Sequence, residues 1–216
     1  LGAGTIVSTW QAVRATRAEE RTQSTLAMVS AERDQKDMAR REAEAMADFL
    51  ADVFRSPDPA KGGRSVTLAE ALDHAAAKLE TSLSNQPQRR AKFQEALAAT
   101  YQSLGLHQEA AGLREQVYQF HLRSSGPDDP QTASAMSELA LAYHFSGRPE
   151  HAVGLLERAR EILHRRLGGD DPQTLGAMQK LAISLDETGR RAEAMELRLT
   201  VLDKTHARFG PDHPRT

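Results

Sequence analysis

The feature that most constrains this chain is a heptapeptide that returns at a fixed interval. GPDDPQT at 126–132 is followed by GGDDPQT at 168–174 and by GPDHPRT at 210–216, in two steps of 42 residues. Leucine, alanine and glycine residues between the heptapeptides keep the same step, so the repetition extends over the whole period. A period of this length predicts stacked copies of one small unit, because a single unit cannot bury its own apolar face.

Each period contains the pattern of two amphipathic helices. Apolar residues recur at spacings of three and four from Pro130 to Gly147, and again from there to Gly168. Glycine suits a helix end, and Pro130 suits a first helical turn whose free amides Asp129 can cap. The sequence therefore predicts an all-α solenoid of antiparallel helix pairs. The residues expected to hold the pairs together recur in register: Leu97, Ala98, Tyr101, Gly105, Ala110, Leu139, Ala140, Tyr143, Gly147, Ala152, Leu181, Ala182, Gly189 and Ala194.

Three further segments precede the repeats. Residues 67–85 predict an amphipathic helix that begins at a capping box of Thr67 and Glu70 and caps the first repeat. Residues 55–66 are rich in proline and glycine and are expected to be a linker. Residues 11–54 contain neither glycine nor proline and predict one long charged helix. Its apolar positions keep no steady heptad, so a solvated stalk and a dimer seam both remain open.

Residues 1–10 hold an apolar run that ends at Trp10, with Arg14 and Arg17 after it. This order is typical of a spanning helix where it leaves the bilayer, and a plain helix start would look the same. The chain does not begin with Met, and it stops at the third heptapeptide, where another repeat would start. We therefore expect it to be part of a longer protein.

The side chains offer no set of residues for catalysis or metal binding. The chain has no cysteine, which excludes disulfides and thiolate ligands, and its 8 histidines form no H-E-x-x-H pair. Asp128 and Asp129 are adjacent and suit a helix cap better than a catalytic pair. The formal net charge of −2 supplies no positive field that would gather nucleic acid. We therefore expect no catalytic residue, no cofactor and no metal in this chain, and a protein or peptide as its partner.

The repeated residues resemble the tetratricopeptide repeat. Its helix-pair signature matches Leu139, Ala140, Tyr143, Gly147, Ala152, Leu156 and Ala159. The 42-residue period resembles the long variant found in kinesin light chains and in many bacterial proteins. The resemblance covers residues 86–216, as repeats of about 86–125, 126–167 and 168–209 and the start of another at 210.

One departure from the pattern concerns the second helix of each repeat. Arg114 and Arg198 stand where Leu156 stands in the middle repeat. Leu113 and Leu197 are therefore expected to supply the apolar contact in those two repeats.

The resemblance implies a peptide-binding groove lined by the first helix of each repeat. The side chains that it places there are Lys92, Glu95, Ala99 and Gln102, then Ser134, Ser137, Leu141, His144 and Phe145, then Gly176, Gln179, Ile183 and Asp186. Leu141, Phe145 and Ile183 are apolar at positions that repeat stacking does not need. They mark a ligand surface or pack against neighbouring second helices, and both interpretations stay open. Kinesin-light-chain repeats usually carry Asn pairs in this helix, where this sequence has Ser137-Glu138 and Gln179-Lys180.

The order of the segments has a second resemblance. It is similar to the region after the membrane helix in receptor-type serine/threonine kinases of planctomycete-like bacteria. This resemblance implies a membrane anchor in residues 1–10 and repeats on the extracytoplasmic side. ATP and Mg²⁺ would belong to a kinase domain outside this chain. The alternative is a soluble scaffold or adaptor in the cytoplasm, with the same repeats, no kinase and no anchor. The sequence leaves open whether the chain forms homo-oligomers.

Overall fold

The computed structural model describes residues 23–41, 43–45, 47–49, 51 and 67–210. The chain divides into two compact units, 1–58 and 59–216. In the first unit the described residues are helical and mostly exposed, with ion pairs from Lys36 to Glu32 at 2.7 Å and from Arg40 to Glu44 at 2.8 Å. The predicted membrane-helix end at 1–10 and the linker at 55–66 lie outside the described residues. None of the helices that the structure describes is long and apolar enough to span a membrane.

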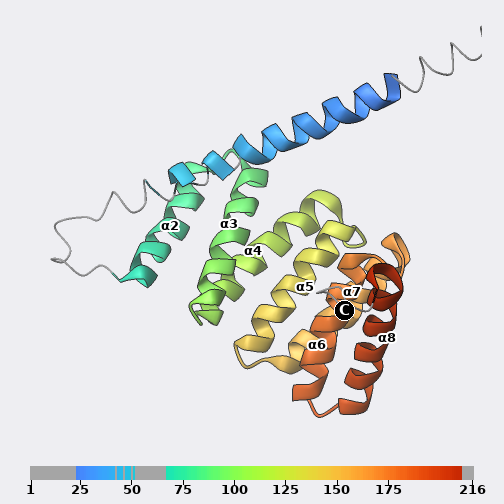
Figure 1. Ribbon diagram of the computed structural model, residues 1–216. Helices are drawn as coiled ribbons and strands as arrows, with labels where there is room; N and C mark the ends of the chain where they lie inside the picture. The colour runs from blue at the N-terminus through green and yellow to red at the C-terminus, as the bar shows by residue number, and fades with distance from the viewer. Residues whose placement is uncertain (1–22, 42, 46, 50, 52–66, 211–216) are drawn as a thin grey trace, which may run out of the picture. The chain divides into compact units, whose positions relative to one another are not determined.

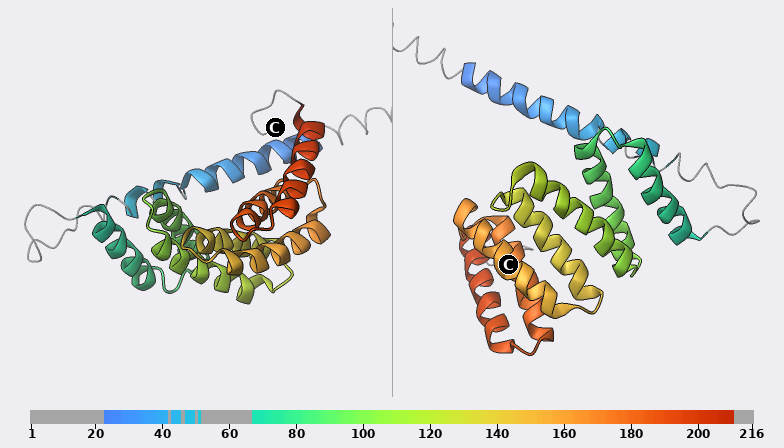
Figure 2. Two further views of the ribbon diagram at one scale, coloured as in Figure 1. Left: turned by 90° about the horizontal axis from the view of Figure 1, so that it is seen from below. Right: turned by 180° about the vertical axis from the view of Figure 1, so that it is seen from behind.

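The second unit is a row of seven labelled helices (Figure 1). In chain order they are α2 (Leu68–Ser82), α3 (Pro87–Ser103), α4 (His107–Ser125), α5 (Pro130–Phe145), α6 (Pro149–Leu167), α7 (Pro172–Glu187) and α8 (Arg191–Phe209). Helices α3 and α4, α5 and α6, and α7 and α8 form antiparallel pairs, and each helix packs on its neighbours in sequence (Figure 2). The described residues contain no strand. The prediction of an all-α solenoid of helix pairs is confirmed.

Helix α2 occupies the place of a second helix in an incomplete repeat. The Tyr101 hydroxyl donates to the Asp73 carboxylate at 2.7 Å, and one period later the Tyr143 hydroxyl donates to Glu115 at 3.0 Å. Burial and these carboxylates raise the pKa of both phenols above the usual value, so both remain protonated donors at neutral pH. The same bond thus ties α2 to α3 and α4 to α5.

The helix ends follow from short sequence signals. The capping box predicted in front of α2 is present, with Thr67 and Glu70 bonded to each other's backbone amides. The Asp129 and Asp171 carboxylates each accept from a backbone N–H two residues on, at 2.8 Å, directly before the prolines that open α5 and α7. At the turn between α5 and α6, Gly147 has φ +79°, a conformation that costs an L-residue with a Cβ about 1–2 kcal/mol.

Two glycine substitutions are expected to change stability in opposite directions. Gly147→Ala forces a Cβ into positive φ and is expected to lower the free energy of unfolding by about 1 kcal/mol. Gly154 lies inside α6 with a negative φ, and a Cβ there would meet nothing within 4 Å. Gly154→Ala is therefore expected to stabilise by about 0.5–1 kcal/mol. The midpoints of urea unfolding would measure the stability of both variants. Shifts of both midpoints in the same direction would contradict the different roles assigned to Gly147 and Gly154.

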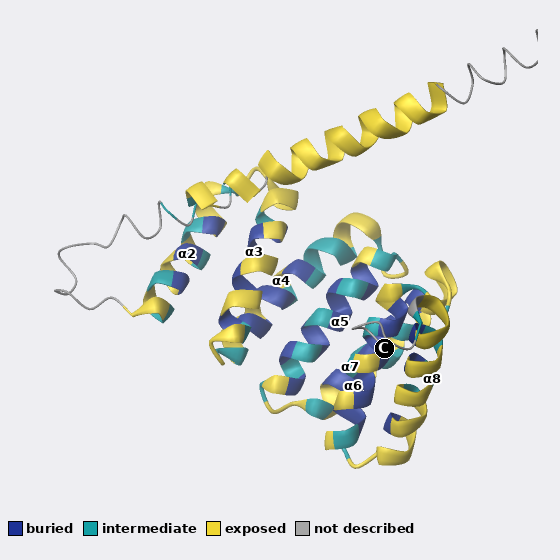
Figure 3. Cartoon of the chain, viewed as in Figure 1, coloured by how far each residue is buried: buried dark blue, intermediate teal, exposed yellow. Residues whose placement is uncertain are grey.

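The core runs between the helix pairs (Figure 3). Ala140 and Ala152 are fully buried where α5 meets α6, in a cluster that also holds Leu156, Leu181 and Leu185. Tyr143 is half-buried. The other apolar residues that were expected to hold the pairs together are buried: Leu97, Ala98, Tyr101, Ala110, Leu139, Leu181, Ala182 and Ala194. The glycines of that set, Gly105, Gly147 and Gly189, have positive φ.

Helix α8 leaves an apolar stripe uncovered. Met195, Leu199 and Leu202 lie at spacings of four and three on one face and are exposed. One period earlier the corresponding side of α6 contacts the next repeat: Val153 shares a core cluster with Leu181 of α7, and Glu157 pairs with Arg190, directly before α8, at 3.1 Å. The exposed stripe on α8 thus corresponds to the side of α6 that the next repeat covers.

Candidate functional site

The first helices of the three repeats, α3, α5 and α7, present one surface, here named the first-helix face. Helices α5 and α7 are in direct contact along it. Ser134 of α5 bonds Gln173 of α7, and Lys180 of α7 pairs with Glu138 of α5. These contacts join the first helices of the second and third repeats, so the face is continuous across α5 and α7.

Some of the predicted groove residues are open on this face. Phe145 of α5 is 45% exposed and Ile183 of α7 is 40% exposed. Gln179 is also exposed. Four more of the predicted residues on these helices are half-buried: Ser134, Leu141, Gly176 and Asp186. Two apolar side chains therefore stand in solvent on helices that touch.

Two other predicted groove residues are not open. Ser137 is 3% exposed and His144 is 5% exposed. His144 Nδ1 lies 3.3 Å from the Ser184 hydroxyl and 3.7 Å from the Glu187 carboxylate, both on α7. Because α7 packs closely against this side of α5, the assignment of Ser137 and His144 to an open groove is corrected: they belong to the contact between repeats.

The Phe145 ring is held in place by its neighbours. It stacks on the ring of His107 from α4, with centroids 5.3 Å apart and planes 24° apart. The ring of His144 meets it edge-on at 5.0 Å. A large apolar side chain that is exposed yet fixed suits an anchor for a partner, because little side-chain entropy remains to be lost on binding.

On α3 the expected groove residues are smaller and more polar. Lys92, Glu95 and Ala99 are exposed, and Gln102 is half-buried. The Gln102 amide oxygen accepts from the Arg114 guanidinium at 3.0 Å. The first repeat thus contributes mainly charge to the first-helix face, and the second and third contribute the apolar anchors.

A charged network that the sequence did not reveal links all three repeats. Arg114 of α4 is only 9% exposed and donates to the Glu138 carboxylate at 2.8 Å as well as to Gln102. Glu138 also accepts from Lys180. The guanidinium and ammonium groups therefore share one carboxylate across α4, α5 and α7. Leu113 is buried beside Arg114, and Leu197 is partly buried, as expected from the departure at this position.

A signal for this network was nevertheless present in the repeats. Arg114 and Arg198 stand at the places that correspond to Leu156 in the first and third repeats. Twelve residues before each of them lies a polar partner: Gln102 bonds Arg114, and Asp186 pairs with Arg198. Where Leu156 stands, that place is taken by His144, which turns to α7 instead. Comparing the two positions together would have predicted the bonds.

The described residues show no arrangement suited to catalysis. No three His, Asp or Glu side chains of the described part gather as a metal site. The adjacent carboxylates at 128 and 129 have separate structural partners: Asp129 caps α5, and Asp128 pairs with Arg165 at 3.0 Å.

Family models agree with this architecture. One model described as tetratricopeptide repeat matches residues 89–164, and a second with the same description matches residues 174–215, so together they span more than half of the chain. None of the curated proteins compared with the sequence matches it.

Solved structures show similar helix pairs. A Podospora anserina protein described as a kinesin light chain with nearly identical TPR-like repeats shares 27% identity, with a TM-score of 0.56 over 83% of this chain and 97% of that chain. A variant of that protein gives a TM-score of 0.56 and 27% identity over 82% and 95% of the two chains. BtubC (BKLC) from P. vanneervenii, at 15% identity and TM-score 0.53 over 82% and 76%, shares the fold.

Proposed function

Because this chain belongs to the tetratricopeptide-repeat proteins, we propose that it is a non-catalytic module that binds a protein or peptide partner on the first-helix face. The observation that carries the proposal is the exposure of Phe145 and Ile183 on two helices in contact. Core packing does not require either side chain to be apolar, since both stand in solvent. Exposed large apolar residues on a rigid surface commonly mark a partner site.

The polar residues of the same face suit orientation more than affinity. Lys92 and Lys180 carry positive charge, and Glu138 and Asp186 carry negative charge. Lys180, Glu138 and Asp186 are already engaged in ion pairs within the chain. The apolar anchors are therefore expected to supply most of the binding free energy, and the charges at their rim to select the direction of a bound peptide.

Substitution of the two anchors tests the proposal. Peptides would be selected from a displayed random library on the whole chain, and their dissociation constants measured by fluorescence anisotropy. Phe145→Ala and Ile183→Ala are each expected to weaken binding by about tenfold, the loss of about 1–2 kcal/mol of buried apolar contact. Leu167→Ala is the matched control, since Leu167 is equally exposed but ends the second helix α6. Unchanged affinity in both anchor variants would contradict the proposal.

We further propose that these repeats are the non-catalytic region of a receptor-type serine/threonine kinase. The support is the order of segments: an apolar run ending at Trp10, a charged helix, a linker rich in proline and glycine, and the repeats. Residues 1–10 would then end a membrane helix, the repeats would face the extracytoplasmic side, and ATP and Mg²⁺ would bind elsewhere in the protein. The alternative is a cytoplasmic scaffold with neither kinase nor anchor.

The coding sequence upstream of Leu1 distinguishes the two proposals. About ten further apolar residues would complete a spanning helix of roughly 20, and kinase motifs before them would support the receptor. A polar stretch there would contradict the anchor and favour the scaffold. Neither outcome changes the expectation for the first-helix face.

A further inference from the structure

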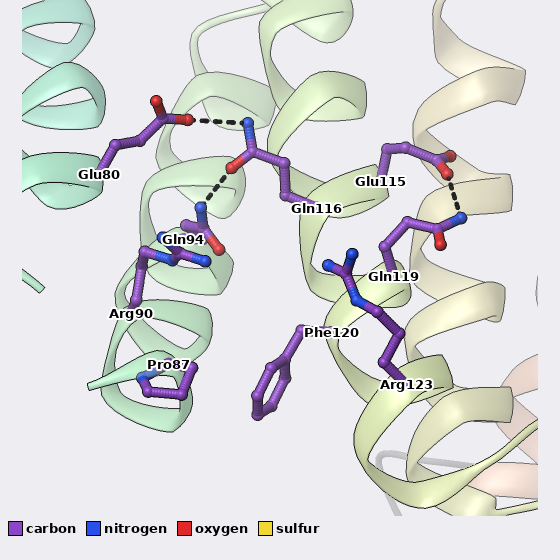
Figure 4. A pocket seen from close by; sticks show the side chains of 9 residues that line it. All are labelled: Glu80, Pro87, Arg90, Gln94, Glu115, Gln116, Gln119, Phe120 and Arg123. Carbon is purple, nitrogen blue, oxygen red and sulfur yellow. Dashed lines mark hydrogen bonds between the residues drawn. The ribbon is translucent and has the colours of Figure 1, made fainter. Parts of the chain in front are cut away.

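A hollow of about 450 Å³ lies between α2, the first turns of α3 and the second half of α4 (Figure 4). Its walls share no residue with the first-helix face. Arg90 and Arg123 extend toward its middle from α3 and α4, and Phe120 lies between them. The hollow is therefore a second surface, on the side of the second helices.

Two residues of α2 and α3 near the hollow's end of the stack differ from their equivalents one repeat later. In the next repeat, Tyr118 of α4 packs against the core cluster that contains Met136 of α5. One period earlier these two places hold Ala76 and Gln94. Alanine is much smaller than tyrosine, so α2 supplies less side-chain volume at this place than α4 does one repeat later.

The floor of the hollow is polar although its place in the repeat is a core position. Gln94 is 3% exposed, whereas the two equivalent residues, Met136 and Met178, are buried methionines. Its amide nitrogen donates to Gln116, and the Gln116 amide donates to Glu80 at 3.2 Å. Burying an amide at a position where methionine packs well has a free-energy cost unless the amide is hydrogen-bonded.

One arginine of the hollow, Arg123, lacks the partner that its equivalent has in the next repeat. Arg165 of α6 pairs with Asp128 of the heptapeptide at 3.0 Å. One period earlier the arginine is kept as Arg123, but the aspartate is replaced by neutral Gln86. Among the described residues, neither the Arg123 nor the Arg90 guanidinium has a hydrogen-bond or ion-pair partner.

The carboxylates of the wall are already engaged. Both Glu115 oxygens accept hydrogen bonds, from Tyr143 at 3.0 Å and from Gln119 at 2.9 Å. Glu80 accepts from Gln116. The hollow thus offers two guanidinium groups without a partner, beside two carboxylates that keep their negative charge but accept hydrogen bonds from neutral side chains.

We propose that this hollow binds an acidic side chain of a partner polypeptide, with its Asp or Glu carboxylate between Arg90 and Arg123. The carboxylate takes the role that Asp128 plays for Arg165 one repeat later. Guanidinium groups suit this ligand, because their paired N–H donors match the two oxygens of a carboxylate. Phe120 offers an apolar surface to the residue beside the acid.

Titration of the ¹⁵N-labelled whole chain with two blocked tetrapeptides tests the proposal. Acetyl-Leu-Asp-Asp-Leu-amide is expected to shift the backbone amides of 87–94 and 116–123 in a saturable manner. Acetyl-Leu-Asn-Asn-Leu-amide is expected to bind about tenfold more weakly, since it lacks the charge. Arg90→Gln and Arg123→Gln should each weaken the acidic peptide by about tenfold, while the matched control Arg165→Gln leaves it unchanged.

Three results would overturn the assignment: no saturable shift with either peptide, equal affinity for both, or unchanged affinity in both arginine variants. Shifts confined to α5 and α7 would overturn it as well, and would instead support binding at the first-helix face. Both arginines reach solvent, so a preserved amide spectrum is expected to show that the variants fold.

Discussion

Leu139→Ala is expected to lower the free energy of unfolding by about 2–5 kcal/mol. Leu139 is among the largest fully buried side chains of the described residues. It lies on α5, the central first helix, which packs on α4, α6 and α7. Truncation removes apolar contacts and leaves a cavity that a helix held on three sides cannot close, which places the expected loss toward the upper end.

Leu141→Ala is the control for this substitution. It removes the same atoms from the same helix two residues later, but Leu141 is only half-buried on the first-helix face. A loss of about 1 kcal/mol or less is expected there. Urea unfolding of both variants would measure the difference, and similar midpoints for the two would show that Leu139 is not a core residue.

Glu138→Ala is expected to destabilise the chain by about 1–3 kcal/mol, although Glu138 is partly exposed. Its carboxylate holds both Arg114 and Lys180. Removing it leaves the Arg114 guanidinium buried with only the neutral Gln102 as a partner. A buried charge without its counter-charge carries an uncompensated desolvation cost.

A double-mutant cycle separates this cost from the loss of other contacts. Leu156 shows that leucine is accommodated at the equivalent position of the middle repeat. In an Arg114→Leu background the guanidinium is absent, so Glu138→Ala is expected to cost at least about 1 kcal/mol less than in the parent. Equal costs in both backgrounds would mean that the ion pair contributes nothing to stability.

Much of the fold could be predicted because its signals are local. Asp129 and Pro130 start a helix and Gly147 ends one through the backbone conformations and hydrogen bonds of a few adjacent residues. The 42-residue register then specifies which helices are equivalent. The buried set from Leu97 to Ala194 follows from helical periodicity within each copy.

The surface was harder to predict because exposure depends on how closely neighbouring repeats approach. Ser137 and His144 have the helical positions of groove residues, yet the contact of α5 with α7 buries them. Phe145 and Ile183 have similar positions and remain open. The distinction is set by the distance and rotation between repeats, which no pattern within one repeat specifies.

The repeated pattern was enough to predict a stack of helix pairs, the signals that start and end helices, and the residues that face the core. These properties follow from backbone preferences and periodicity inside one 42-residue unit. Three features came from the folded chain alone: which surface residues stay accessible, the network of Arg114, Glu138 and Lys180, and the hollow between α2, α3 and α4. Each of these depends on contacts between side chains from different repeats, and a one-dimensional pattern does not contain the geometry that brings them together.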